Sequence, residues 1–173
     1  MNQIAYENYN SIMCWTGYTS HKRIADKDIP CKKVIGYDNN IGVYKAWFIP
    51  NVCYSIGHLY TSELGVKARA FPDTLPPKGD LEIEITKGLH CYADSLRVAR
   101  HNSIFRHGLA IGNFLIYESY DKPYTITLVD CIIPRGATYY ENERGEIVTN
   151  KLKLVKIYEF TDEETDSYTD KET

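Results

Sequence analysis

The sequence predicts an α+β domain, built mostly from a twisted antiparallel sheet with one main helix at about residues 94–107. Tyrosine, which favours strands and half-buried surfaces, occurs 15 times, against 5 phenylalanines and 2 tryptophans. Many segments are rich in β-branched and aromatic residues or alternate apolar with polar positions, which is typical of strands. Only one segment combines a capping signal with an amphipathic pattern. Many strands and a single helix favour the α+β class.

The chain divides into three parts. Residues 1–41 mix aromatic side chains with Asn, Ser, Thr and Gly without periodicity, so we expect an irregular arm packed on the body, with a short strand at 34–37. Residues 42–160 form a single α+β domain, a suitable length for one core. Residues 161–173 are acidic and polar, with Tyr168 as their one apolar residue, and should be a disordered tail.

The strands are expected in the following order along the domain. They lie at 42–49, 53–60 with a turn at Gly57, 81–86, 110–117, 124–133, 139–140 and 147–158, the last bent near Asn150. Residues 71–80 hold three of the seven prolines and must form a loop. The polar segment 141–145 is a hairpin loop.

The stretch 87–100 is the most informative part of the chain. An alternating strand leads to Gly88, a short apolar run follows, and Asp94 or Ser95 can cap the helix, with Gly108 suited to its C-terminal end. Junctions of this kind expose backbone amides and place polar side chains where ligands bind. We therefore expect a functional site near residues 88–97.

The charge, the cysteines and the hydropathy of the chain argue against several classes of protein and of binding site. The net charge of −3 gives no general attraction to nucleic acid or anionic membranes. The five cysteines are scattered and odd in number, without zinc-type spacing, so neither a metal site nor a complete disulfide framework is expected. No secretory signal or membrane-spanning run is visible. These observations favour a cytoplasmic protein with no membrane partner.

His90 and the helix arginines are the candidate binding residues read from the pattern alone. His90 follows a glycine at an apolar strand, directly before the capped helix, whereas the other histidines are expected to be surface or hydrogen-bonded residues. Arg97, Arg100 and Arg106 form either a solvated helix face or an anion or partner site. Cys91 cannot form a dyad with His90 easily, because neighbours on a strand point to opposite faces.

Residues 88–99, Gly-Leu-His-Cys-Tyr-Ala-Asp-Ser-Leu-Arg-Val-Ala, resemble the central motif of the ADP-ribosyltransferase superfamily. Residues 132–136 and 145–148 resemble its later strands, and 43–47 stand where its first strand would be. The resemblance implies an ADP-ribosyltransferase-like core in which Glu146 stabilises the ribosyl centre and His90 contacts nicotinamide or ribose. The implied cofactor contacts are Tyr44, Lys45, His90, Tyr92 and Arg97, with NAD as the cofactor if the chain is catalytic.

Two departures from that motif favour a degenerate site. Lys45-Ala46 stands where the superfamily has His or Arg, and His90 stands where it has a central Tyr. Those groups would hold the adenosine ribose and stack on nicotinamide, so a non-catalytic version of the scaffold is at least as well supported. Glu146 then becomes an exposed carboxylate that closes the Arg144-Gly145 hairpin.

A second resemblance points to a biological setting. Residues 54–60, 88–91 and 133–140, including Gly-Leu-His-Cys and Pro-Arg-Gly-Ala-Thr-Tyr-Tyr, resemble an uncharacterised family found in phages and bacteria. The leading hypothesis is a small soluble domain that binds a protein partner or a nucleotide. The alternatives are an active NAD-using mono-ADP-ribosyltransferase and a phage inhibitor that contacts a host or defence protein through its tyrosines.

Overall fold

The computed structural model describes residues 3–4, 15–17, 22–46, 52–68, 83–102, 109–111, 114–116, 124–161 and 163–164. Its elements are β1 (Gln3–Ile4), β2 (Trp15–Gly17), β3 (Arg23–Ile24), β4 (Ile29–Asp38), β5 (Val43–Lys45), β6 (Cys53–Tyr54), β7 (Leu59–Thr61), β8 (Gly65–Ala68), β9 (Ile83–Lys87), β10 (Leu89–Ala93), α1 (Leu96–Asn102), β11 (Leu109–Ile111), β12 (Phe114–Ile116), β13 (Tyr124–Ile133), β14 (Thr138–Glu141), β15 (Glu146–Thr149) and β16 (Lys151–Ile157).

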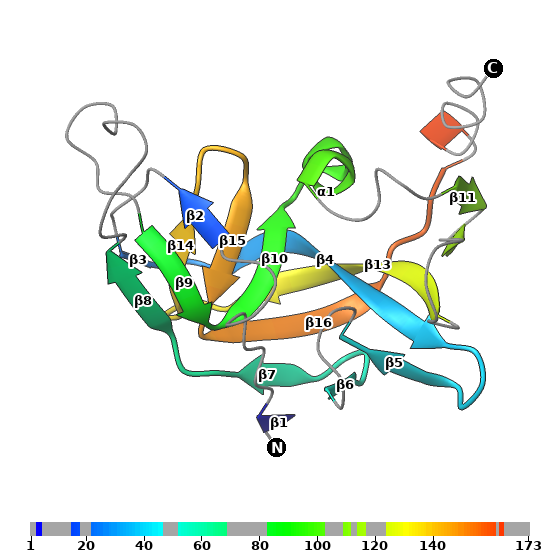
Figure 1. Ribbon diagram of the computed structural model, residues 1–173, viewed down its shortest axis with the longest axis horizontal. Coiled ribbons are helices and arrows are strands. Elements are labelled where there is room, and N and C mark those ends of the chain that lie inside the picture. Colours follow the sequence, from blue (N-terminus) through cyan, green and yellow to red (C-terminus); the bar gives the residue numbers. More distant parts are fainter. Residues whose placement is uncertain are drawn as a thin grey trace.

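The architecture of these residues is largely all-β. Thirteen of the described strands form one sheet whose main path runs β1-β7-β16-β13-β4-β10-β15-β14-β3, and β2, β9 and β8 form a second sheet (Figure 1). The pairings are antiparallel except that of β1 with β7. The predicted α+β class with one main helix is therefore wrong, because strands supply nearly all of the described structure.

The structure describes one short helix within the predicted span of 94–107. As described, α1 covers seven residues, Leu96–Asn102, and residues 103–107 lie outside the described part of the chain. Ser95 caps it: its Oγ accepts a hydrogen bond from the N–H of Val98 at 3.3 Å. Its buried contact is small, since Ala99 is its fully buried apolar residue. A helix with so narrow an apolar face adds little to a core that strands supply.

The main sheet curls back on itself at Asn150. A single residue separates β15 from β16, yet β15 pairs with β10 and β14, whereas β16 pairs with β13 and β7. The side chain of Asn150 accepts a hydrogen bond from the N–H of Thr138 at 2.9 Å, and its backbone bonds Thr138 and Ser62. The predicted bend near Asn150 is therefore a sharp corner that closes the curl.

The core has three parts. The largest lies inside the curl and contains Leu89, Cys91, Ile147, Leu152 and Leu154 among others. A second, smaller cluster lies on the outer face of β4 and β13, beneath α1 and the segment that follows β16. A third lies between β15 and the small sheet. Of the candidate site residues, Tyr92 packs in the second cluster, and His90 lies opposite Val148 of the third.

The long strand β4 extends further than the sequence predicts. The expected strand at 34–37 is the C-terminal half of β4, which begins at Ile29 and pairs along its full length with β13. Lys32 and Lys33 interrupt the apolar pattern that is typical of a central strand, because such strands rarely bury two adjacent ammonium groups. Residues 29–38 thus lie at the centre of the sheet, although they fall in the segment expected to be an arm.

Candidate functional site

The pairing of β10 with β15 brings the two predicted catalytic residues to one face. His90 lies opposite Val148, and Tyr92 lies opposite Glu146. Paired residues in an antiparallel ladder share a face, and so do alternate residues along one strand. His90 and Glu146 are therefore diagonal neighbours, with Cα atoms roughly 7–8 Å apart. One ligand the size of a dinucleotide can reach both.

The carboxylate of Glu146 is engaged within its own hairpin. Its Oε1 lies 2.9 Å from Nε of Arg144 and accepts a hydrogen bond from Nδ2 of Asn142 at 3.4 Å. Burial raises the pKa of Glu146, while Arg144 and Asn142 act in the opposite direction. The buried Asn142 also accepts hydrogen bonds from the backbone N–H groups of Arg144 and Glu146, both at 3.0 Å. The hairpin turn itself thus positions this carboxylate.

The predicted contacts on the first strand lie elsewhere. Tyr44 lies opposite Tyr37, with ring centroids 5.0 Å apart, and packs against the core inside the curl. Burial, followed by the proximity of Tyr37, raises the pKa of Tyr44. Lys45 forms an ion pair with Asp38 at 3.3 Å. Because β5 pairs with residues 36–38 of β4 and β10 with residues 31–32, Tyr44 lies about 15 Å along the sheet from Tyr92.

Tyr92 and Arg97 lie near Glu146. Tyr92 packs in the cluster beneath α1 and lies opposite both Glu146 and Lys32. Arg97 is exposed on α1. The β14–β15 hairpin contacts the helix directly, since a Cβ added to Gly145 would lie 2.8 Å from a methyl carbon of Val98. The structure thus brings together His90, Tyr92, Arg97 and Glu146, and separates them from Tyr44 and Lys45.

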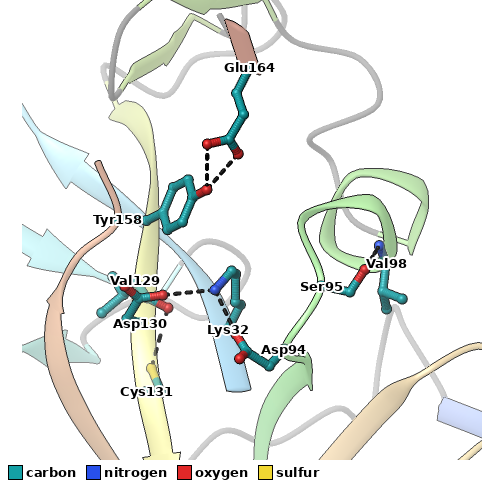
Figure 2. A network of polar contacts seen from close by, with 9 residues as sticks. All are labelled: Lys32, Asp94, Ser95, Val98, Val129, Asp130, Cys131, Tyr158 and Glu164. Atoms are coloured by element: carbon teal, nitrogen blue, oxygen red, sulfur yellow. Dashed lines mark hydrogen bonds and ion pairs between the residues drawn. The ribbon is translucent and has the colours of Figure 1, made fainter. Parts of the chain in front are cut away.

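A second polar group centres on Lys32, which sequence reasoning missed. Its side-chain Nζ contacts Oδ1 of Asp94 at 2.7 Å and Oδ1 of Asp130 at 2.8 Å, and it lies 4.8 Å from the centre of the Tyr158 ring (Figure 2). Burial alone would lower the pKa of Lys32, but the hydrogen bonds and charges of the two aspartates outweigh it and raise the pKa. Lys32 is therefore a fixed cation that joins β4 to β13 and to the start of α1.

The segment after β16 completes this group. The hydroxyl of Tyr158 donates to the carboxylate of Glu164, at 2.8 and 2.5 Å from its two oxygens (Figure 2). Thr161 and Glu164 form reciprocal hydrogen bonds, N–H of Thr161 to Oε1 and N–H of Glu164 to Oγ1, which is a helix capping box. The Thr-x-x-Glu spacing was the available signal for it. The remainder of the predicted tail lies outside the described residues.

The described cysteines favour neither nucleophilic nor metal chemistry. Cys31, Cys91 and Cys131 are buried thiols, with Cys31 directly opposite Cys131, and Cys53 is exposed. Burial raises the pKa of Cys131 well above its ordinary value, which keeps the thiol protonated and unreactive. Within the described ranges, no three His, Cys, Asp or Glu side chains are arranged to hold a metal ion.

Comparisons with known proteins identify no relative of this chain. No family model matches the chain, and neither the curated proteins nor the solved structures contain a significant match. Both sequence resemblances therefore stay predictions. Among the described residues, no helix is long and apolar enough to cross a membrane.

Proposed function

We propose that this chain is a binding domain for a protein partner rather than a transferase. The observation that carries the proposal is the pairing of Glu146 with Arg144 at 2.9 Å. A transferase carboxylate must present uncompensated negative charge to a developing ribosyl cation. Here a guanidinium neutralises that charge and burial disfavours ionisation, so electrostatic stabilisation of such a cation is weak.

The local charge balance also supports a protein over a dinucleotide. Around the β10–β15 face and the start of α1, the described cations are Lys32, Arg97 and Arg144. The described carboxylates nearby are Asp94, Asp130, Glu143, Glu146 and Glu164. A pyrophosphate requires a clear excess of donors and positive charge. Mixed charges around half-buried aromatic and aliphatic side chains are typical of a protein–protein surface.

The partner surface we propose is made by α1 and the β14–β15 hairpin. The N–H of Ala93 donates to the carbonyl of Gly145 at 2.8 Å, and Gly145 packs against Val98. The two elements pack together, each carries an exposed charge, and we propose that Arg97 and Glu143 belong to one rigid face. A rigid face of this kind reduces the entropy cost of association. The setting we propose, from the second resemblance, is a phage or its bacterial host.

Affinity capture with a net-neutral charge swap tests this proposal. The variant Arg97→Glu/Glu143→Lys reverses both charges of the face and leaves the net charge unchanged. A partner captured from lysate of the bacterium that carries the gene, or of its infected host, should bind this variant at least about tenfold more weakly. The matched control Lys27→Glu/Glu159→Lys, also exposed, should bind as wild type. Equal loss in both variants, or none in the first, would refute the assignment of this face.

A further inference from the structure

The outer face of β16 carries a row of exposed positive charge. Lys151, Lys153 and Lys156 are all exposed. Among the described residues, no carboxylate lies within ion-pair distance of any of the three, whereas Lys32, Lys45 and Lys87 all have such partners. Asp130, opposite Lys156, is bonded to Lys32. The row exists in a chain whose net charge is −3, so it does not reflect a general excess of cations.

The position of β16 makes this row unusual. Lysines often protect the edge strands of a sheet against unwanted pairing. Lys153 is paired on both sides, with Ile132 of β13 and with Leu59 of β7, whereas Lys151 pairs with β7 and Lys156 with β13. Protection of an edge therefore does not account for Lys153, at the centre of the row.

Apolar side chains flank the row on both neighbouring strands. Lys153 lies opposite Ile132 on β13 and opposite Leu59 on β7, so all three share the outer face. Ile132 and Leu59 are half-buried, and Val155, at the irregularity in the β13–β16 register, is 37% exposed. This sheet face thus combines a line of exposed cations with apolar contact area. Charge of one sign on such a face gives electrostatic complementarity to an acidic partner.

We propose that this face, defined by Lys151, Lys153, Lys156, Leu59 and Ile132, is a docking surface for an extended, acidic segment of a partner protein. Alternate residues on a strand are separated by about 6.6–6.8 Å. An extended segment with a carboxylate at every second position presents charges at the same interval as Lys151 and Lys153. The methylene groups of those acidic side chains would pack on Leu59 and Ile132, which share the outer face with Lys153. None of the five residues belongs to α1 or to the β14–β15 hairpin, so the surface is additional to the face proposed above.

Nucleic acid fits this face less well. Single-stranded nucleic acid is bound by cations together with aromatic side chains on which the bases stack. None of the described residues that define this face is aromatic, and the negative net charge of the chain opposes long-range attraction of a polyanion. A polypeptide has fewer charges and can use the apolar contacts, so it is the occupant that the observations favour.

Fluorescence anisotropy with the full chain tests the docking surface. The probe is a labelled peptide that alternates glutamate with threonine or valine. The wild type should bind it with an affinity that falls as salt rises, and Lys151→Glu/Lys153→Glu/Lys156→Glu should weaken binding at least about tenfold. The control Lys22→Glu/Arg23→Glu/Lys27→Glu carries the same charge change on exposed residues and should weaken it far less. Thermal unfolding of each variant confirms that it folds.

Four results would overturn the proposal. They are absence of binding at millimolar peptide, equal losses in both triple variants, tighter binding of a labelled oligothymidine than of the peptide, and salt-sensitive self-association that the β16 variant abolishes. The third would assign the face to nucleic acid and the fourth to a second copy of this chain. None of them depends on the α1–hairpin face, so failure here leaves the function proposed above untouched.

Discussion

At the scale of single residues, the group around Lys32 shows how a buried charge is accommodated. Lys32 is only 7% exposed, and an isolated ammonium group at such a position would carry a large desolvation penalty. Two aspartates and the Tyr158 ring replace its water. The side chains of Asp94 and Asp130 remain 48% and 27% exposed. Lys32 therefore has two ion-pair partners that both stay in contact with water. The group joins β4, β13, the start of α1 and the C-terminal segment.

Tyr158→Phe gives a pH-dependent test of this group. Burial, followed by the hydrogen bond to Glu164, raises the pKa of Tyr158 to about 12, against about 10 in an unfolded chain. A raised pKa stabilises the fold below the unfolded value, and this contribution is lost as pH rises through the folded value. The variant should lose about 1 kcal/mol at pH 7. Urea unfolding should show that this difference shrinks between about pH 10 and 12.

Glu164→Gln is the companion variant for that experiment. It keeps a hydrogen-bond acceptor for the Tyr158 hydroxyl but removes the charge that opposes ionisation of the phenol. The alkaline loss of stability should therefore be smaller, and should end at lower pH, than in the wild type. A stability difference between wild type and Tyr158→Phe that stays constant over the whole pH range would show that the phenol does not titrate as described.

At the scale of elements, the contact between the β14–β15 hairpin and α1 sets the geometry of the candidate site. Asn142 fixes the turn, Gly145 allows the close approach to Val98, and Ser95 caps the helix. The sequence predicts the hairpin, the cap and the bend at Asn150 because local side-chain-to-backbone bonds encode them. It does not predict which side chains α1 meets on the sheet, because β4 and β13 are distant along the chain.

Gly145→Ala tests this contact. Gly145 has φ +78° and Gly136 has φ +87°, but a Cβ at Gly136 meets nothing within 4 Å. Gly136→Ala should therefore cost about 1–2 kcal/mol of backbone strain alone. Gly145→Ala should cost roughly 1–3 kcal/mol more, because its Cβ overlaps Val98.

Denaturant unfolding in a Val98→Ala background separates the two contributions. Removing the Val98 methyl groups should reduce the extra cost at Gly145 and leave the cost at Gly136 unchanged. Equal costs at the two glycines, or no coupling between Gly145 and Val98, would mean that the hairpin and the helix do not pack as described.

At the scale of the whole molecule, most strands are visible in the sequence but their arrangement is not. The segment 124–133 is β13, and the extended pieces at 53–60, 139–140 and 147–158 are all strands. The order β16-β13-β4-β10-β15 joins segments far apart along the chain, and single-sequence periodicity carries no information about such partners. β4 was partly missed because Lys32 and Lys33, satisfied only by distant residues, interrupt its apolar pattern.

The residues of the candidate site likewise divide into those that the sequence predicts and those that it does not. His90, Tyr92, Arg97 and Glu146 come from local motifs and lie close together. Tyr44 and Lys45 were placed by analogy with a first strand, and the observed pairing of β5 with the far end of β4 separates them from the others. The Lys32 group forms where four segments distant in the sequence meet. No local sequence pattern therefore predicts it.

The central claim is that the chain binds a partner and does not transfer ADP-ribose, and calorimetric titration of NAD into the wild-type chain tests it most directly. Nicotinamide release should be followed by chromatography in the same samples. Because Arg144 and Asn142 hold the carboxylate of Glu146, we predict no saturable heat and no nicotinamide release above background, with Glu146→Gln indistinguishable from the wild type. Saturable NAD binding with nicotinamide release that Glu146→Gln abolishes would contradict the claim.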